Sequence, residues 1–156
     1  TIEKYFRAWK AEGPKPPIDL PPAVPNKPNS VAVPDESRVQ DSVVLAQTVP
    51  LTRADADYYA LDLGTAVLGG SFYSTRLSID LRKNAGLVYS VGADINAGRT
   101  RGNYFIQYAS DPENVTKAQA MVVQELKRMQ DMPVGDEELR REMLLTELRQ
   151  RVRTGY

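Results

Sequence analysis

Proline is concentrated in one short part of this chain, and that concentration limits where a folded domain can lie. Eight of the eleven prolines fall between residues 14 and 34 of the 156-residue sequence. Proline has no amide hydrogen and a fixed φ, so such density excludes helix and favours an extended, polyproline-like backbone. We therefore expect residues 13–29 to form a semi-rigid linker and residues 30–156 to form one α+β domain. A proline-rich ligand for SH3-type modules is the alternative interpretation of the linker.

The residues before the linker have the pattern of an amphipathic helix. Within residues 1–12, apolar side chains recur at helical spacing at Ile2, Tyr5, Phe6 and Trp9. Because a native domain seldom begins in the middle of a helix, we expect residues 1–12 to be the end of a helix from an upstream domain. The sequence is therefore expected to be a piece of a longer protein.

Charge and residue usage exclude several classes of function. Twenty basic and twenty acidic side chains cancel, so the chain lacks the overall positive field that attracts nucleic acid. It contains neither cysteine nor histidine, which excludes disulfides, thiol chemistry and a histidine-activated hydrolytic triad. A zinc site would need carboxylates alone, which is rare for that metal. No apolar run approaches the roughly 20 residues that a membrane-spanning helix needs.

Hydrophobic periodicity and turn residues predict an α+β fold. The predicted strands are 31–33, 41–49, 88–95 and 103–109, the last two joined as a hairpin. The predicted helices are 54–68, 74–84, 111–132 and a last helix from 136 onward. Thr52, Ser74 and Asp111 are expected to cap three of these helices. Since strands and helices segregate along the chain, we expect an antiparallel sheet with helices packed on one face.

Two further expectations concern the ends and faces of these helices. The Gly69-Gly70 pair is expected to end the helix at 54–68, because glycine commonly terminates helices. The last helix is expected to bury Leu139, Met143, Leu148 and Val152.

Arg82 and Tyr89 are the strongest candidates for chemistry. They stand seven positions apart, at the end of a predicted helix and the start of a predicted strand, with Gly86 at the bend. This arrangement can aim both side chains into one cleft. A guanidinium offers a fixed fork of donors and a phenol offers one directional donor, so the pair suits a carbonyl or carboxylate group. The alternative is structural: Arg82 would neutralise helix carbonyls and Tyr89 would be a half-buried strand residue.

The segment that contains this pair resembles a known family motif. It reads Leu68-Gly69-Gly70, then Ser74-Thr75-Arg76-Leu77, then Leu81-Arg82-Lys83-Asn84-Ala85-Gly86-Leu87-Val88-Tyr89-Ser90-Val91. This pattern resembles the C-terminal-type domain of the pitrilysin/insulinase family of zinc metallopeptidases, with one inserted threonine, Thr75. The Asp111-Pro112-Glu113 helix start and the Glu137-Glu138-Leu139 turn also resemble the family. The resemblance therefore covers essentially the whole chain.

The resemblance implies a role in peptide hydrolysis that this chain shares with another domain. Family members pair α+β domains as two bowl-shaped halves around a chamber, and one half binds zinc through an inverted histidine-x-x-glutamate-histidine motif. The other half contributes an arginine and a tyrosine, which Arg82 and Tyr89 match. Arg82 would anchor the backbone of an unfolded peptide, and Tyr89 would donate a hydrogen bond to the scissile carbonyl as it becomes an oxyanion.

Further expectations follow from the resemblance. The zinc would be bound by another domain or a partner subunit, no cofactor would be held here, and this piece alone would be inactive. Bacterial relatives suggest a periplasmic location. One alternative is a non-proteolytic structural or assembly subunit of the same family. Another is a free-standing peptide-binding module that uses the strand edge near residues 31–33.

Overall fold

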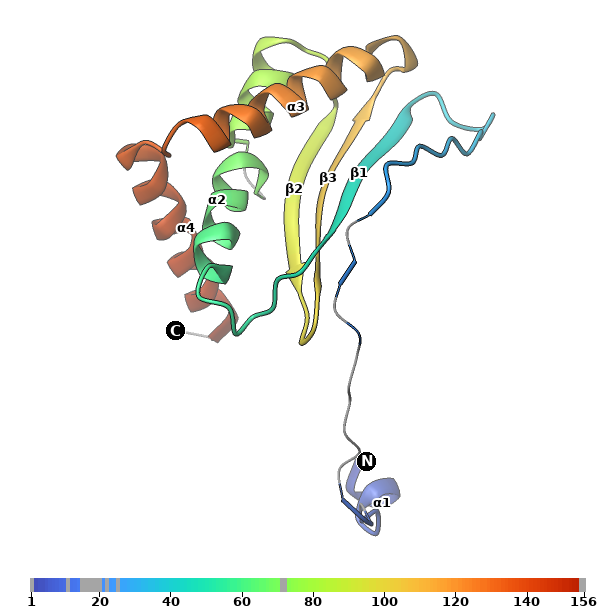
Figure 1. Ribbon diagram of the computed structural model, residues 1–156, viewed down its shortest axis with the longest axis vertical. Helices are drawn as coiled ribbons and strands as arrows, with labels where there is room; N and C mark the ends of the chain where they lie inside the picture. The colour runs from blue at the N-terminus through green and yellow to red at the C-terminus, as the bar shows by residue number, and fades with distance from the viewer. Residues whose placement is uncertain are drawn as a thin grey trace.

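A three-stranded antiparallel sheet forms the centre of the protein. The computed structural model describes residues 2–10, 12–14, 21, 23, 24, 26–70 and 73–154. The strands are β1 (Asp41–Val49), β2 (Ser90–Ala97) and β3 (Gly102–Ser110). β3 lies in the middle, in the order β1-β3-β2, and pairs antiparallel with both neighbours (Figure 1). The predicted strand at 41–49 and the predicted hairpin are both confirmed.

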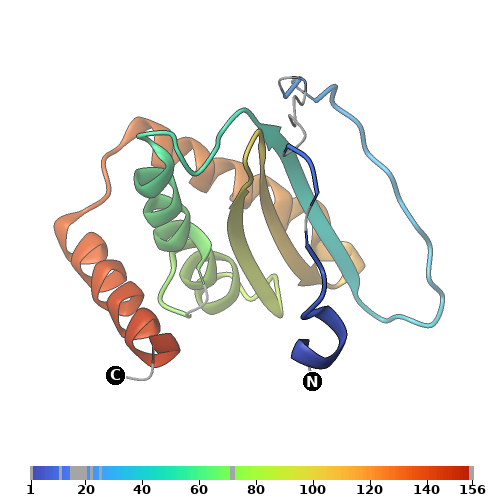
Figure 2. The ribbon, with the colours of Figure 1, turned by 90° about the horizontal axis from the view of Figure 1, so that it is seen from below.

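The helices gather on one side of this sheet, which confirms the predicted α+β fold. The larger helices are α2 (Tyr58–Gly69), α3 (Val115–Asp131) and α4 (Asp136–Thr154). Two shorter ones lie with them, the π-helix η1 (Ser78–Asn84) and the 3-10 turn η2 (Pro112–Asn114). Figure 2 shows α2 between α4 and the sheet, and α3 crossing the strands. No helix of the described residues is both long and apolar enough to span a membrane.

The core lies between the sheet and the helices. Alternation along the strands turns Ala93, Ile95, Ile106 and Tyr108 inward, and all four are buried. Helical spacing turns apolar side chains of η1 and α3 onto the same core, as the sequence pattern predicts. These helix residues are Leu81, Ala118 and Val122. The opposite face of the sheet exposes side chains such as Val44 and Gln107.

Two glycines shape the chain on either side of η1. A Cβ atom on Gly69 would lie 2.7 Å from the backbone nitrogen of Ala93, so this glycine lets the end of α2 rest directly on β2. Gly69 is thus a packing residue as well as a helix end. Gly86 has a φ of +64°, a left-handed conformation that glycine adopts without strain, and it reverses the chain toward β2 as expected.

Three details of the predicted elements are wrong: one strand, one helix start and one helix cap. Residues 31–33 form no strand and are exposed, because prolines flank them and the described sheet offers them no partner. α2 begins at Tyr58 rather than 54, because hydrogen bonds between Thr52 and Asp55 close a turn first. Ser74 is not the residue that caps the next helix. At the start of η1, the amide of Ser78 donates a hydrogen bond to the hydroxyl of Thr75, at 3.4 Å.

The N-terminal segment contains a short helix, α1 (Ile2–Phe6), whose side chains are exposed. Figure 1 shows α1 apart from the sheet and the other helices. Residues 15–20, 22 and 25 of the predicted linker lie outside the described residues. The expectation that residues 1–12 end a helix of an upstream domain stays a prediction.

The buried face of α4 differs from the predicted one. Of the four predicted side chains, Leu139 is partly buried, but Met143, Leu148 and Val152 are exposed, whereas Glu142 is completely buried. α4 packs against α2, and the less exposed row of α4 side chains, at spacings of three and four residues, includes Glu138, Glu142 and Leu145. An ion pair from Glu138 to Arg76 holds the first turn in this orientation. Beyond Leu139, the apolar row that the sequence pattern assigns to the core is therefore exposed.

Candidate functional site

Arg82 projects from η1 onto an aromatic ring. Its guanidinium carbon lies 4.4 Å from the centre of the Tyr73 ring, which is a cation–π contact. Both side chains are exposed. The contact holds the planar fork of Arg82 at the surface, where its donors remain available to a ligand. Arg82 therefore rests on Tyr73 rather than on the carbonyls of its own helix.

The turn from η1 to β2 fixes the backbone that carries Tyr89. The amides of Ala85, Gly86 and Leu87 donate to carbonyls of the last turns of η1, with Leu87 bonding Leu81 at 2.8 Å. Leu87 and Val88 are buried and anchor the turn in the core. The Tyr89 amide then donates to the carbonyl of Ala109 on β3 at 2.8 Å. Since Val88 points inward, Tyr89 points outward, and it is about half exposed.

The Tyr89 phenol is held by Asp111. Its Oη lies 3.0 Å from both Oδ1 and Oδ2 of that carboxylate. The hydrogen bond to Asp111, and secondly the charge of Asp111, raise the pKa of the Tyr89 phenol above its ordinary value of 10.0. Asp111 makes no cap hydrogen bond with its side chain, so the predicted capping role is wrong. Its carboxylate accepts the hydrogen bond from the Tyr89 hydroxyl instead.

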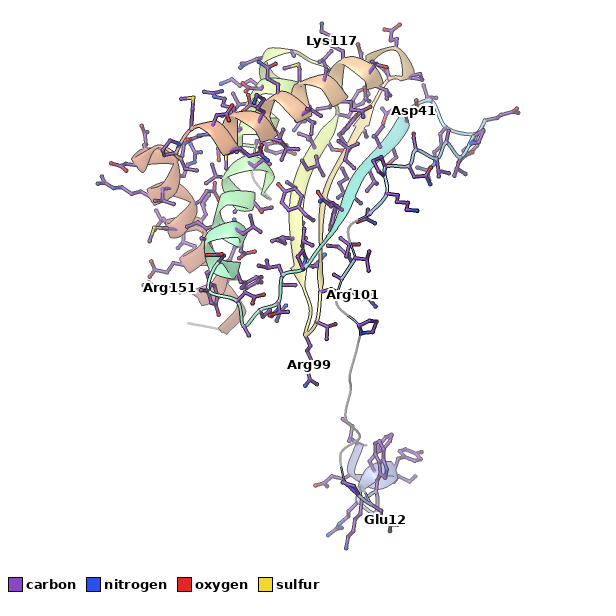
Figure 3. The ribbon with its side chains drawn as sticks, viewed as in Figure 1. Glu12, Asp41, Arg99, Arg101, Lys117 and Arg151 are labelled. Atoms are coloured by element: carbon purple, nitrogen blue, oxygen red, sulfur yellow. The ribbon has the colours of Figure 1, made fainter. Side chains whose placement is uncertain are left out.

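A buried serine joins the two strand ends beside this pair. Ser110 is completely buried, and its hydroxyl lies 2.9 Å from the carbonyl of Leu87 and 3.1 Å from that of Asp111. The segment before Tyr89 and the segment of Asp111 are thus tied by one side chain. In Figure 3 the labelled Asp41, which pairs with Ser110, lies at this end of the sheet, and Arg99 and Arg101 lie at the opposite end.

An open groove runs beside these residues. It encloses about 1050 Å³ between the β2 edge, α2 and α4. Tyr73 and Ser90, the neighbours of Arg82 and Tyr89, line it, as do Gly92 on β2 and Met143 on α4. Arg82 and Tyr89 themselves stand outside its lining. The site residues are therefore near a concave surface rather than within it.

Comparison with protein families decides the identity of the domain. The profile described as "Peptidase M16 inactive domain" matches residues 1–144. The chain belongs to the peptidase M16 family. The match confirms the family that the motif of residues 68–91 predicts. Among curated proteins the comparison finds no match.

Solved structures share the fold of this M16 domain. A crystal structure described as the peptidase M16 inactive domain from Pseudomonas fluorescens has a TM-score of 0.64 and 28% identity, over 67% of this chain and 25% of that one. A protease from Helicobacter pylori has a TM-score of 0.66 and 17% identity, over 73% of this chain and 27% of that one. A conserved protein from Enterococcus faecalis has a TM-score of 0.65 and 20% identity, over 74% and 27%.

This M16 domain corresponds to only a part of each solved chain. The chain spans about a quarter of the length of the three solved chains. At 17% and 20% identity, the second and third structures show likeness of fold alone.

The residues of this M16 domain do not suit zinc. In the part of the chain that the structure describes, no three histidine, cysteine, aspartate or glutamate side chains gather where a metal ion would fit. Zinc sites in proteins are built mainly from histidine and cysteine, and the sequence has neither.

The two site residues that the sequence predicts are exposed and rigidly mounted in this M16 domain. Among the described residues, no hydrogen bond or ring contact joins Arg82 to Tyr89, because each has its own support. Their common action on a peptide stays a prediction. Sequence reasoning missed Asp111 as the partner of Tyr89. The hairpin register contained the signal, since Ser90 pairs with Ala109 and so places Tyr89 next to the end of β3.

Proposed function

We propose that this chain is the substrate-contacting, non-zinc domain of an M16 zinc metalloendopeptidase that cleaves unfolded peptides. Arg82 and Tyr89 contact the substrate, and the zinc belongs to another domain of the same chain or to a partner subunit. A periplasmic location is part of this proposal. By itself the domain does not hydrolyse peptide bonds.

One observation carries the proposal. Within a domain of the M16 family, the chain presents an arginine and a tyrosine at the motif positions, both exposed and both held by rigid secondary structure. Arg82 rests on the Tyr73 ring, and the Tyr89 backbone is fixed to β3. Neither side chain is needed by the core. Exposed polar side chains on a fixed backbone are what binding to a peptide backbone requires.

The chemistry of each residue defines its role. The Arg82 fork donates to backbone carbonyls of an extended peptide and keeps its register. The Tyr89 phenol donates to the scissile carbonyl oxygen as negative charge develops on it. When bound in the other domain, zinc would supply the activated water for the attack. The contribution of this chain is binding, orientation and one hydrogen bond to the oxyanion.

Substitution in the complete peptidase tests the proposal. Tyr89→Phe is expected to lower kcat by about 10-fold to 1,000-fold while KM changes little, because an oxyanion donor acts mainly in the transition state. Arg82→Gln is expected to raise KM. Tyr5→Phe, on the exposed helix α1, is the matched control and is expected to leave both constants unchanged. Unchanged turnover in Tyr89→Phe would remove Tyr89 from the mechanism.

A second candidate is a non-proteolytic structural or assembly subunit of the same family. The family description "inactive domain" and the absence of histidine from the sequence favour it. The exposed Arg82 and Tyr89 argue against it, because a scaffold has no need of this pair. If neither the rest of the protein nor its partner carries the inverted zinc motif, the structural role is correct.

A further inference from the structure

The hydroxyl hydrogen of Tyr89 is already in use. A phenol has one hydrogen to donate, and an ionised carboxylate can only accept. Since the Tyr89 Oη lies 3.0 Å from both oxygens of Asp111, the hydrogen must point to that carboxylate. The phenol that is proposed to donate to an oxyanion therefore has no second hydrogen for that purpose. Its remaining lone pairs can only accept.

The contact between Tyr89 and Asp111 is built into the fold. β2 begins one residue after Tyr89, and β3 ends one residue before Asp111. The Tyr89 amide is bonded to the Ala109 carbonyl, and the Asp111 carbonyl accepts the amide of Asn114 at 2.9 Å. Ser110 bridges the two segments. Both side chains thus leave fixed backbone at the same end of the sheet, so their meeting does not depend on a mobile loop.

We propose that Asp111 is a positioning residue that holds the hydroxyl hydrogen of Tyr89 until the peptide carbonyl becomes negatively charged. This inference rests on the proposed function. In the chain without peptide, the hydrogen points to the Asp111 carboxylate. As the oxyanion develops, the hydrogen rotates about the Cζ–Oη bond and is donated to the oxyanion instead. No bond between heavy atoms is made or broken, and Tyr89 and Asp111 keep their protonation states.

The Asp111 carboxylate and the substrate oxygen compete for the hydroxyl hydrogen of Tyr89, and this competition affects the reaction rate in one direction. A carboxylate is a stronger acceptor than a neutral peptide carbonyl, so the hydrogen stays with Asp111 in the ground state. Only an oxyanion competes with it, and the nearby Asp111 charge also repels that oxyanion. The carboxylate therefore lowers the rate at which Tyr89 assists the reaction. In return, it keeps the ring in one orientation.

Asp111→Asn separates these effects. The introduced amide has nearly the same shape and can donate to the phenol oxygen, which leaves the hydroxyl hydrogen free for the substrate. The matched control is Asp41→Asn, which removes a carboxylate from the neighbouring strand position opposite Ser110. That control changes the charge at the same end of the sheet. It leaves the partner of Tyr89 in place.

The first experiment follows the phenol directly in the 156-residue chain. Tyrosine labelled with ¹³C at Cζ is titrated by NMR, and Tyr89→Phe identifies the Tyr89 signal among the eight tyrosines. Asp111→Asn is expected to lower the pKa of Tyr89 toward 10.0, and Asp41→Asn is expected to leave it unchanged. An unchanged pKa in Asp111→Asn, or an equal change in Asp41→Asn, overturns the inference.

The second experiment measures peptide cleavage by the complete peptidase. Asp111→Asn is expected to raise kcat by about threefold to tenfold, because one charge-assisted hydrogen bond no longer competes. The double variant Tyr89→Phe/Asp111→Asn is expected to equal Tyr89→Phe, since Asp111 acts only through the phenol. A fall in kcat with Asp111→Asn as large as that of Tyr89→Phe overturns the inference, as does a gain that persists in the double variant.

These results also distinguish two kinds of failure. If Tyr89→Phe cleaves peptides at the normal rate while Asp111→Asn still lowers the pKa of Tyr89, the hydrogen bond is real and the proposed function is wrong. If Tyr89→Phe loses activity while Asp111→Asn changes neither the pKa nor kcat, the proposed function stands and the inference about Asp111 is wrong.

Discussion

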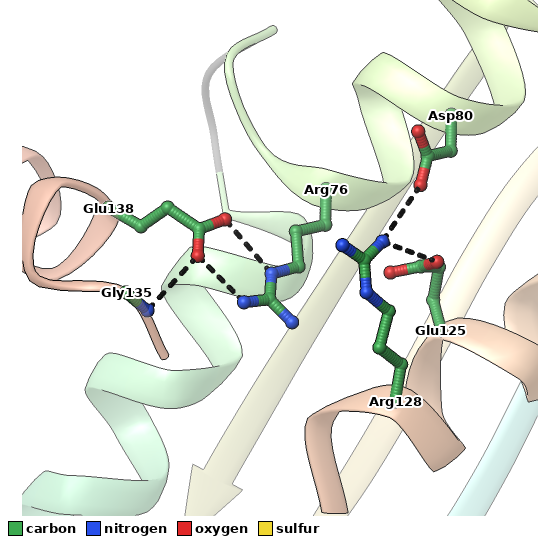
Figure 4. Close-up of polar contacts among 6 residues, drawn as sticks. All are labelled: Arg76, Asp80, Glu125, Arg128, Gly135 and Glu138. Carbon is green, nitrogen blue, oxygen red and sulfur yellow. Dashed lines mark hydrogen bonds and ion pairs between the residues drawn. The ribbon is translucent and has the colours of Figure 1, made fainter. Parts of the chain in front are cut away.

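Arg76 and Glu138 form a bidentate ion pair that links the segment just before η1 to the first turn of α4. Nε of Arg76 lies 2.9 Å from Oε1 of Glu138, and Nη2 lies 2.7 Å from Oε2 (Figure 4). The Arg76 side chain is 11% exposed and that of Glu138 is 29% exposed. The Gly135 amide also donates to Oε2 at 3.4 Å. Two parts of the family motif that lie 62 residues apart thus meet in one contact.

Neutralising the acid of this pair is expected to destabilise the fold. Glu138→Gln leaves the largely buried Arg76 guanidinium without its counter-ion, which typically costs about 2 kcal/mol. The midpoint of thermal unfolding is expected to fall by about 4–8 °C for a domain of this size. Glu137→Gln, at the exposed neighbouring position, is the control and is expected to unfold at the normal temperature. Equal midpoints for the two variants would contradict a stabilising role.

The same pair makes part of the stability dependent on pH. The hydrogen bond from Arg76 holds the pKa of Glu138 below its ordinary value of 4.5. A carboxyl group with a lowered pKa stabilises the fold fully above its unfolded pKa, and the contribution is lost as the pH falls through the folded pKa. The stability difference between wild type and Glu138→Gln is therefore expected to be constant near neutral pH and to shrink below about pH 4.5. Denaturant titrations across this range measure it.

Glu125 is expected to show the opposite pH dependence. Burial, and secondly the charge of Asp80, raise the pKa of this carboxyl above 4.5, although Arg128 lies 3.4 Å from it (Figure 4). A raised pKa means that the ionised form is less favourable in the fold, so the carboxylate weakens stability above its folded pKa. Glu125→Gln is expected to raise the unfolding temperature at pH 7, with a gain that disappears below about pH 4.5. A lower unfolding temperature at pH 7 would contradict this, and the exposed Glu113→Gln is the control.

The buried hydroxyl of Ser110 gives a prediction about the end of the sheet. Ser110→Ala removes the donor shared by the Leu87 and Asp111 carbonyls. The Asp111 carbonyl keeps the Asn114 amide as a donor, whereas the Leu87 carbonyl loses the Ser110 hydroxyl. A buried carbonyl left without a donor costs about 1–2 kcal/mol, and we expect a loss of this size in the free energy of unfolding. Ser42→Ala, at an exposed position of β1, is expected to change it by less than about 0.5 kcal/mol. Chemical denaturation of both variants makes the comparison.

Local patterns predicted those parts of the fold in which the sequence alone determines the geometry. β1, the hairpin and α3 follow from alternation, from the glycine-containing turn and from helical spacing. The buried face of α4 did not follow, because a long-range ion pair to Arg76 rotates Glu142 inward instead of Met143. The start of α2 also failed, since the Thr52–Asp55 turn competes with helix at that point.

In the candidate site, too, local sequence patterns predicted some features and long-range contacts determined the others. Arg82 and Tyr89 are recognisable from a contiguous motif, and Gly86 has the predicted left-handed turn. The side chains that contact these two residues, Tyr73 and Asp111, could not be predicted from the motif. Tyr73 precedes Arg82 by nine positions, and Asp111 follows Tyr89 by 22. Such partners depend on how helix and strand ends meet in space, which residue spacing along one element does not report.

Two glycines of α2 give opposite predictions for the same substitution. Gly69→Ala would place a Cβ atom 2.7 Å from the Ala93 backbone nitrogen and 2.8 Å from its Cβ, so α2 would have to move away from β2. Overpacking of this kind typically costs about 1–3 kcal/mol. Gly64→Ala is the control in the same helix, because its Cβ would meet only the Met129 Cε, at an ordinary 3.9 Å. There alanine is expected to stabilise the helix by about 0.5–1 kcal/mol. Thermal unfolding of the two variants should therefore shift in opposite directions, and a shift in the same direction would show that α2 does not rest on β2 as described.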